Sequence, residues 1–234
     1  MQPVKNTAVT LDWMEADRAF SIPKKPPLAA RDDWRYRWTT RVLDVLCSLI
    51  GLILAIPIVA VAAIAIKLTS KGPVFFRQPR AGAAMRSFNM YKLRTMYTGA
   101  DDDKILFRDH NSLPTGPCFK MKNDPRVTTV GRWLRRSSMD ELPQLLNIFL
   151  GDMSLVGPRP LPLDEVVTNS PAQKLRFSVK PGLTCLWQVS GRTEIPYDEW
   201  LALDVWYIRN RSLSLDLQIL IKTLPAVLSG RGAY

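Results

Sequence analysis

Two adjacent carboxylates, Asp140 and Glu141, lie in the segment SSMDELPQ (137–144), between a pair of serines and a proline. A strongly basic run, GRWLRR (131–136), comes just before them. Carboxylates in such a place can balance positive charge, cap a helix, bind a hard cation such as Mg²⁺, or attack phosphorus as nucleophiles. The surrounding residues indicate which of these roles the sequence favours.

Pro143 limits where the helix containing LLNIF can begin, because proline is tolerated in the first turn of a helix but not deeper inside it. We therefore predict Asp140 as the helix N-cap and Glu141 in the first turn. Ser138 and Glu141 also match the capping-box spacing, but a cap at Ser138 would push Pro143 past the first turn. Capping and dipole balance alone would account for about 1–2 kcal/mol of stability.

Arginines on both sides of the carboxylate pair favour a phosphate site over simple capping. Helix N-termini bind phosphate, Arg135 and Arg136 lie just upstream, and Arg159 lies downstream in GPRP. Flanking prolines would hold the Arg159 guanidinium for bidentate phosphate contact. Two carboxylates close to phosphates also suit Mg²⁺. The residues themselves thus predict phosphoryl chemistry.

The composition of the chain agrees with an anionic partner. Its 234 residues contain 32 Lys and Arg against 21 Asp and Glu, a net charge of +11. Such an excess suits nucleic acid, an acidic membrane surface or phosphorylated substrates. The one histidine, His110, lies in a polar stretch and is interpreted as a surface residue, and the three scattered cysteines indicate reduced thiols in a cytoplasmic environment.

The uncharged segment 45–66 is long enough to cross a bilayer as a helix. Pro57 lies near its middle, and basic residues flank it on both sides, with no acid between residues 67 and 99. Positive charge prefers the cytoplasmic side of a membrane. We therefore predict a re-entrant helical hairpin over residues 41–68, broken at Pro57, that keeps both flanks inside. A kinked spanning helix is the alternative.

The remaining sequence predicts an α/β fold, mostly helical with a small sheet, in one cytoplasmic catalytic domain over residues 69–234. Residues 1–40 are predicted to be a flexible and interfacial N-terminal segment. Short apolar runs at 72–82 and 85–97 predict strands or extended loops, and KPGLTCLWQVSGR (180–192) predicts a turn followed by a strand. Two C-terminal segments, 197–210 and 214–230, predict amphipathic helices that pack on the core or lie in the membrane interface.

The segment SSMDELPQLLNIFLGDMSLVGPRP (137–160) closely resembles the signature of the bacterial sugar transferase family, the monotopic polyprenyl-phosphate phosphoglycosyl transferases. The resemblance continues through VFFRQPRAG, YKLRTM, KPGLTCLWQVSGR and LDVWYI, and covers about residues 40–225. Several separate motifs in the order of the family make it specific. One departure is Ile56-Pro57, where family members often have Ser-Pro, so the hydroxyl that can satisfy a freed carbonyl is missing.

The resemblance implies transfer of a sugar phosphate from a UDP-sugar to undecaprenyl phosphate, with release of UMP, to initiate exopolysaccharide synthesis. It implies that Asp140 is the nucleophile and carries a covalent phospho-sugar, that Glu141 binds Mg²⁺ or assists as a base, and that both carboxylates are metal ligands. It further implies a place on the cytoplasmic face of the bacterial inner membrane, in contact with membrane lipids. The residues expected to bind phosphate or substrate are Arg159, Lys92, Arg94, Arg136, Gln188 and Arg192.

Some alternatives stay open at this level. Glucose and galactose are both plausible donor sugars, and the oligomeric state, including a homodimer, is not determined. A non-catalytic membrane adaptor would account for the net charge and the apolar segment, but not for the spacing of DELPQ and GPRP. A nucleic-acid partner is not expected, because no recognised reading motif is present.

Overall fold

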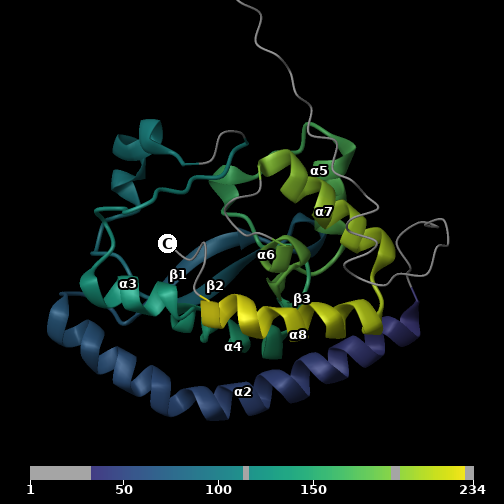
Figure 1. Ribbon diagram of the computed structural model, residues 1–234, viewed down its shortest axis with the longest axis horizontal. Coiled ribbons are helices and arrows are strands. Elements are labelled where there is room, and N and C mark those ends of the chain that lie inside the picture. Colours follow the sequence, from purple (N-terminus) through teal and green to yellow (C-terminus); the bar gives the residue numbers. More distant parts are fainter. Residues whose placement is uncertain (1–32, 113–115, 191–195, 230–234) are drawn as a thin grey trace, which may run out of the picture.

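The computed structural model describes residues 33–112, 116–190 and 196–229. Helices dominate it, and its strands form two small two-stranded sheets (Figure 1). The prediction of a mostly helical chain with little sheet is therefore confirmed. The helices and strands are α2 (Trp34–Thr69), β1 (Phe75–Ala81), β2 (Ser87–Leu93), α3 (Thr129–Arg136), α4 (Gln144–Leu150), β3 (Ser154–Val156), α5 (Pro171–Leu175), β4 (Gly182–Thr184), α6 (Leu186–Ser190), α7 (Tyr197–Asn210) and α8 (Leu213–Ser229).

The long helix α2 corrects the predicted break at Pro57. It runs without interruption from Trp34 to Thr69, with Pro57 inside it, and Figure 1 shows it as a broad arc beneath the rest of the protein. A proline removes one hydrogen bond and bends a helix, but long apolar arms on both sides can continue it. The helix also begins before residue 41, because Asp33 caps it by accepting a hydrogen bond from the Arg35 amide at 3.0 Å. Residues 1–32 lie outside the described residues.

The N-terminal arm of α2 is attached to the domain by polar contacts. The Arg41 guanidinium donates hydrogen bonds to the carbonyls of Ile148 and Phe149, both at 2.7 Å, at the C-terminal end of α4. The Asp44 carboxylate accepts hydrogen bonds from the Ser154 hydroxyl at 3.1 Å and the Leu155 amide at 2.8 Å. Because Asp44 is buried, these partners are needed to satisfy its charge.

The C-terminal arm of α2 packs against the same domain. Ala62 and Ile66 are buried in a cluster with Leu93 of β2 and Leu134 of α3. The face of α2 opposite these contacts is apolar and exposed, as at Leu54 and Val61. By length and composition alone, α2 could cross a membrane. Its two ends, however, contact one domain on one side, which Figure 1 also shows.

The sheets follow the predicted strands in part. β1 and β2 pair antiparallel from Phe75 opposite Leu93 to Ala81 opposite Ser87. β4 pairs parallel with β3 but ends at Thr184. The turn and strand predicted within residues 180–192 are therefore confirmed in part, because the strand is short and residues 186–190 form α6. The partner strand β3 ends at Val156, so no edge remains for a longer β4 to pair with.

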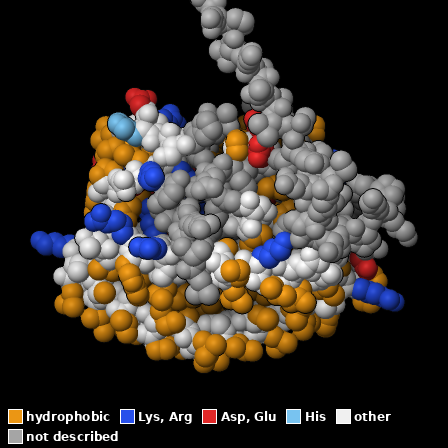
Figure 2. Space-filling model, viewed as in Figure 1, with side chains coloured by type: hydrophobic (Ala, Val, Ile, Leu, Met, Phe, Trp, Pro, Cys, Tyr) orange, Lys and Arg blue, Asp and Glu red, His pale blue; other side chains and the backbone are white. Residues whose placement is uncertain are grey.

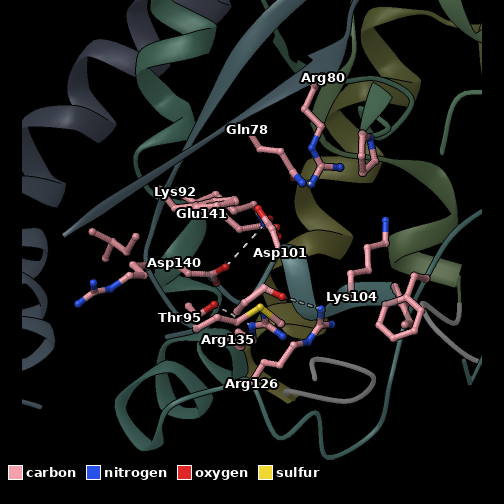
Figure 3. A pocket seen from close by; sticks show the side chains of 18 of the residues that line it. Gln78, Arg80, Lys92, Thr95, Asp101, Lys104, Arg126, Arg135, Asp140 and Glu141 are labelled. Carbon is pink, nitrogen blue, oxygen red and sulfur yellow. Dashed lines mark hydrogen bonds and ion pairs between the residues drawn. The ribbon is translucent and has the colours of Figure 1, made fainter. Parts of the chain in front are cut away.

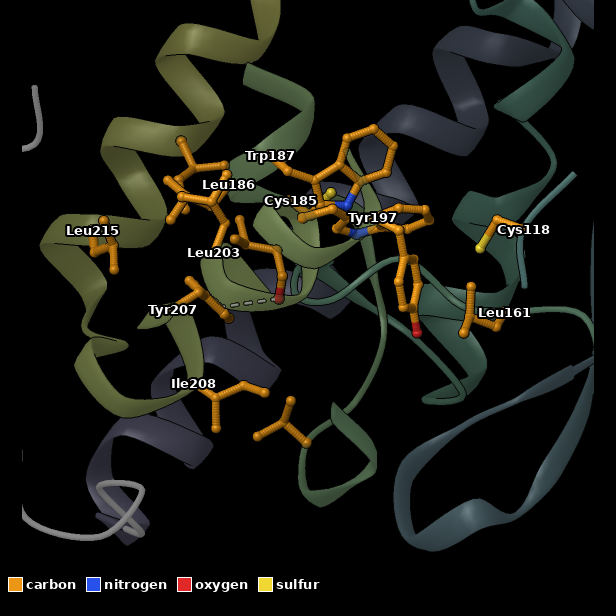
Figure 4. Packing of buried hydrophobic residues seen from close by; sticks show 14 residues of the cluster. Cys118, Leu161, Cys185, Leu186, Trp187, Tyr197, Leu203, Tyr207, Ile208 and Leu215 are labelled. Atoms are coloured by element: carbon orange, nitrogen blue, oxygen red, sulfur yellow. Dashed lines mark hydrogen bonds between the residues drawn. The ribbon is translucent and has the colours of Figure 1, made fainter. Parts of the chain in front are cut away.

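The main hydrophobic core lies between α6, α7 and α8, as predicted for the C-terminal helices (Figure 4). The rings of Trp187 and Trp200 pack in a tilted arrangement, with centroids 4.3 Å apart and planes 48° from parallel. α8 buries Leu215 and Ile219 in this core. Its other side exposes apolar residues such as Leu224, and Figure 2 shows hydrophobic side chains gathered along the base of the molecule, over α2.

Gly131 controls how closely α3 approaches the end of β2. A Cβ atom at this position would come within 1.9 Å of the Thr95 carbonyl oxygen, which is backbone and cannot move aside cheaply. We expect Gly131→Ala to destabilise the protein by about 2 kcal/mol or more, through overpacking, measured as a lower thermal unfolding midpoint. The exposed neighbour Arg132 provides the control: Arg132→Ala should change stability by less than about 0.5 kcal/mol. An unchanged midpoint for Gly131→Ala would contradict the close approach.

Candidate active site

The two carboxylates lie on a single 3-10 turn, Met139–Glu141, between α3 and α4. Ser138 precedes this turn with a φ of 57°, and Pro143 immediately precedes the first residue of α4. The prediction that Asp140 caps this helix is therefore wrong. The left-handed backbone at Ser138 turns the chain sharply, so that Met139–Glu141 forms a turn of its own ahead of the helix. Gly151, with a φ of 96°, ends α4 as glycine commonly does.

Glu141 is held by two cations from other parts of the chain. Its Oε1 atom accepts a hydrogen bond from Lys92 Nζ at 2.8 Å and another from Arg159 Nη2 at 2.6 Å. Lys92 is on β2, and Arg159 is in the loop after β3. Asp140 is buried, with Oδ2 3.7 Å from the same Lys92 ammonium. Figure 3 shows Lys92 lying beside both acids.

These contacts shift the pKa values of the two acids in opposite directions. Burial raises the pKa of Asp140 above its usual range, although Lys92 opposes the shift. Burial would raise the pKa of Glu141 as well, but the charges of Arg159 and Lys92 outweigh burial and hold that pKa well below its usual range. Asp140 is thus the more basic carboxylate, and Glu141 is the permanent anion. Acids with pKa values moved apart in this way commonly take different chemical roles.

The acid pair opens onto a cavity of about 530 Å³ (Figure 3). Residues from distant parts of the sequence line it, from Pro73, just before β1, to Trp200 of α7. Charged and polar side chains make up much of the wall around the acids. These charged and polar lining residues include Gln78, Arg80, Lys92, Thr95, Lys120, Arg135, Arg159 and Gln188.

The loop that carries Arg159 is held in place by two other arginines. Arg176 Nη2 donates a hydrogen bond to the Arg159 carbonyl at 3.0 Å, and Arg80 Nη1 donates one to the Pro160 carbonyl at 2.9 Å. Arg176 is itself buried and pairs with Asp204 of α7 through Nε and Oδ2 at 2.8 Å. The GPRP loop is therefore supported by the core as well as stiffened by its prolines.

The structure brings some of the predicted site residues together and separates others. Lys92 and Arg159 contact Glu141, and Gln188 lines the cavity. Arg94 also borders the cavity, but its guanidinium is occupied by hydrogen bonds to Lys71, Thr98 and Ser70, where α2 ends. The structure therefore gives Arg94 a structural role, and we do not retain it as a phosphate ligand.

The structure does not place Arg136 in the cavity. Arg136 is exposed and does not line it, whereas its neighbour Arg135 does, donating from Nε to Thr95 Oγ1 at 2.9 Å. Neighbouring residues of a helix point about 100° apart, and the run of arginines in the sequence does not reveal which one faces inward. Arg192 lies outside the described residues. His110 is exposed and does not line the cavity, as predicted for a surface residue.

Two cavity cations, Arg80 and Lys120, were not identified from the sequence. For Arg80 a signal existed: Phe76, Gln78 and Arg80 alternate with exposed residues along β1, so they share one face of the strand. Lys120 carries no comparable signal, because it follows a loop whose path depends on tertiary contacts.

The residues present fit a magnesium ion. Among the residues described here, no group of three or more His, Cys, Asp or Glu is placed to hold a metal. Mg²⁺ nevertheless binds commonly through one or two carboxylates together with substrate phosphates and water. The hydrogen bonds that Glu141 accepts from Lys92 and Arg159 both use Oε1. Its Oε2 atom and the Asp140 carboxylate remain as hard oxygen donors of the kind that Mg²⁺ prefers.

The fold and the cavity define a helical domain, with a long apolar helix at its base, whose acid pair faces a cluster of cations suited to phosphorylated ligands. The chain belongs to the bacterial sugar transferase family, whose model matches residues 35–230. The resemblance identified in the sequence is thereby confirmed.

Three relatives illustrate the range of the family. The galactosyl transferase CpsE of Streptococcus agalactiae is 44% identical over 194 residues, covering 82% of this chain and 43% of the relative. The exopolysaccharide production protein ExoY of Sinorhizobium fredii is 40% identical over 199 residues, covering 83% and 87%. The UDP-glucose:undecaprenyl-phosphate glucose-1-phosphate transferase of Caulobacter vibrioides is 41% identical over 202 residues, covering 83% and 71%. The chain thus spans less than half the length of the Streptococcus relative.

Proposed function

We propose that the protein transfers a sugar phosphate from a UDP-sugar to undecaprenyl phosphate, releasing UMP, as the first step of exopolysaccharide synthesis. The observation that carries the proposal is the pair formed by buried Asp140 and half-buried Glu141 at a cavity rich in cations. The Caulobacter relative is named for this reaction with UDP-glucose, and the Sinorhizobium relative for exopolysaccharide production. Galactose, named in the Streptococcus relative, is the other candidate sugar.

In the proposed reaction Asp140 acts as the nucleophile. A carboxylate oxygen of Asp140 attacks the β-phosphorus of the donor, the bond from that phosphorus to the bridging oxygen breaks, and UMP leaves with the electron pair. Undecaprenyl phosphate then attacks the same phosphorus and releases Asp140. The raised pKa of Asp140 supports this assignment because it marks the more basic carboxylate of the pair.

Glu141 and its cations have a different role in the proposal. The lowered pKa of Glu141 makes it a weak base, so we favour a binding role over proton removal. Lys92 and Arg159 both contact Glu141, and in the proposal they would also contact the phosphates. Asp140 and Glu141 would hold Mg²⁺, which would supply positive charge against the diphosphate.

UMP release tests the proposed function. The full chain in lipid nanodiscs, given undecaprenyl phosphate and a panel of UDP-sugars, should release UMP with UDP-glucose or UDP-galactose. Chelation of divalent cations should stop the release and added Mg²⁺ should restore it. A non-catalytic membrane adaptor would release no UMP with any sugar, and that result would overturn the proposal.

The membrane placement we propose follows from the two attached ends of α2. The exposed apolar face of α2 and the exposed side of α8 would enter one leaflet, while the domain stays on the cytoplasmic face. The helix would then be re-entrant as a bent, continuous arc rather than as a broken hairpin. A spanning helix would require one of its attached ends to separate from the domain.

Cysteine labelling distinguishes these topologies. In a Cys47→Ser background the remaining Cys118 and Cys185 are buried, so Arg35→Cys and Lys71→Cys each add one exposed thiol near an end of α2. We expect a membrane-impermeant maleimide to label both from the cytoplasmic side only, measured in inverted and right-side-out vesicles. Labelling of Lys71→Cys from the periplasmic side alone would show that the helix spans.

A further inference from the structure

Two half-buried cations of the cavity, Arg80 and Lys120, form no ion pair with any carboxylate of the described residues. Arg80 donates hydrogen bonds to neutral acceptors, the Pro160 carbonyl at 2.9 Å and Gln78 Oε1 at 2.5 Å. The Lys120 ammonium lies 5.2 Å from the centroid of the Trp187 ring. Glu165, an acid close to Arg80, is already bound by Lys104 at 2.7 Å.

The surroundings of both cations disfavour their charged forms. Burial and the neighbouring charge of Arg159 lower the pKa of Arg80 to about 10 and that of Lys120 to about 8. Gathering buried positive charges without anions is unfavourable unless a ligand compensates them. The cavity therefore holds excess positive charge that an anionic ligand would neutralise.

The positions of these cations show where such an anion would lie. Asp140 has Lys92 beside it, with the ammonium 3.7 Å from Oδ2. Arg80 and Lys120 are instead tied to the segment that follows the GPRP loop. Arg80 forms a β-bridge with Pro162, and the amide of Phe119, next to Lys120, donates a hydrogen bond to Glu165 Oε1 at 3.3 Å. Figure 3 shows Lys92 and Glu141 between Arg80 and Asp140. Arg80 thus lies beyond Glu141, on the side away from Asp140, and Lys120 lines the same cavity next to the segment that Arg80 contacts.

We propose that Arg80 and Lys120 form a single monophosphate subsite that is used twice in each turnover, first by the phosphate of UMP and then by the phosphate of the polyprenyl acceptor. This inference rests on the proposed function. In an in-line displacement the leaving group departs opposite the attacking atom. The phosphate that leaves when Asp140 attacks, and the phosphate that later attacks to release Asp140, therefore occupy the same position relative to the transferred phosphorus.

In each of the two steps, one bond to phosphorus forms and one breaks. In the first step the oxygen that bridges the two phosphorus atoms keeps the bonding pair and becomes a terminal oxygen of UMP, which Arg80 and Lys120 stabilise. UMP then leaves the subsite. In the second step an oxygen of the acceptor phosphate, held by the same cations, forms the new bond to phosphorus, and the Asp140 carboxylate leaves with its electron pair.

UMP binding to the full chain in nanodiscs tests the subsite. An Asp140→Asn background prevents chemistry, and the dissociation constant for UMP is measured by calorimetry. Adding Lys120→Gln should weaken UMP binding about tenfold, as expected for losing one charged contact, whereas Lys120→Arg should stay within about threefold. Lys122→Gln, at an exposed position outside the cavity, is the matched control and should not change the constant. Thermal unfolding midpoints confirm that each variant is folded.

A competition measurement tests whether UMP and the acceptor phosphate share the subsite. Undecaprenyl phosphate added to the nanodiscs should raise the apparent dissociation constant for UMP in proportion to its density, while undecaprenol should not. An unchanged UMP affinity in Lys120→Gln, or UMP binding that ignores undecaprenyl phosphate, would overturn the inference and leave the proposed function standing. Failure of the wild-type chain to bind UMP at all would contradict the proposed function, and the inference with it.

Discussion

Replacing Asp140 by asparagine should lower turnover by about 10³-fold or more, because the side chain keeps its shape but loses the oxygen that attacks phosphorus. The fold should survive, since Glu141 retains its hydrogen bonds from Lys92 and Arg159 and a buried charge is removed. Membrane association should also be unchanged, because α2 and α8 are untouched. The measurement is UMP release by Asp140→Asn in nanodiscs with donor and acceptor present.

The control for this variant is Asp198→Asn, which removes a carboxylate from an exposed position on α7 that does not line the cavity. Its rate should match that of the wild-type protein. Full turnover by Asp140→Asn would show that another group attacks the donor, and Glu141 would then be the next residue to replace.

Arg176→Gln should lower the free energy of unfolding by about 3–5 kcal/mol, because it leaves the Asp204 carboxylate buried without its cation. Asp204 is 1% exposed and pairs with Arg176 at 2.8 Å. For a chain of this size, the loss corresponds to a thermal unfolding midpoint lower by about 10 °C. The substitution also removes the hydrogen bond to the Arg159 carbonyl, so remaining activity should show weaker donor binding.

A double replacement distinguishes the effect of an unpaired buried charge from nonspecific destabilisation. Arg176→Met with Asp204→Leu removes both charges and should be more stable than Arg176→Gln alone. Lys174→Gln, at an exposed position two residues from Arg176, should shift the midpoint by no more than a degree or so. A midpoint for Arg176→Gln equal to that of the wild-type protein would contradict the structural role of the pair.

The sequence predicts which residues meet at the site better than it predicts the local geometry there. The order of the DELPQ and GPRP motifs identifies Asp140, Glu141 and Arg159 as candidates, and the structure places the three together. The capping prediction for Asp140 is wrong because the left-handed backbone at Ser138 cannot be deduced from residue types. The choice between Arg135 and Arg136 depends on which side of α3 faces Thr95, a tertiary contact.

The predicted membrane segment shows a similar limit. Length, hydropathy and flanking charge identify the segment within α2, but not whether Pro57 breaks it. Packing at Arg41 and Asp44 on one arm, and at Ala62 and Ile66 on the other, fixes both ends to the domain. These contacts join residues that are far apart in the sequence, so no local pattern predicts them. The position of Lys120 in the cavity likewise depends on tertiary contacts, and no local pattern predicts it.

The central claim, covalent transfer through Asp140, is tested most directly by mass spectrometry of the protein after brief incubation with UDP-sugar and Mg²⁺ and without acceptor. We expect the intact protein to gain the mass of one sugar phosphate, located on the peptide containing Asp140, and to lose it when undecaprenyl phosphate is added. The Asp140→Asn variant should gain nothing. A wild-type protein that releases UMP with acceptor present but never carries the adduct would contradict the account and indicate direct transfer between the two substrates.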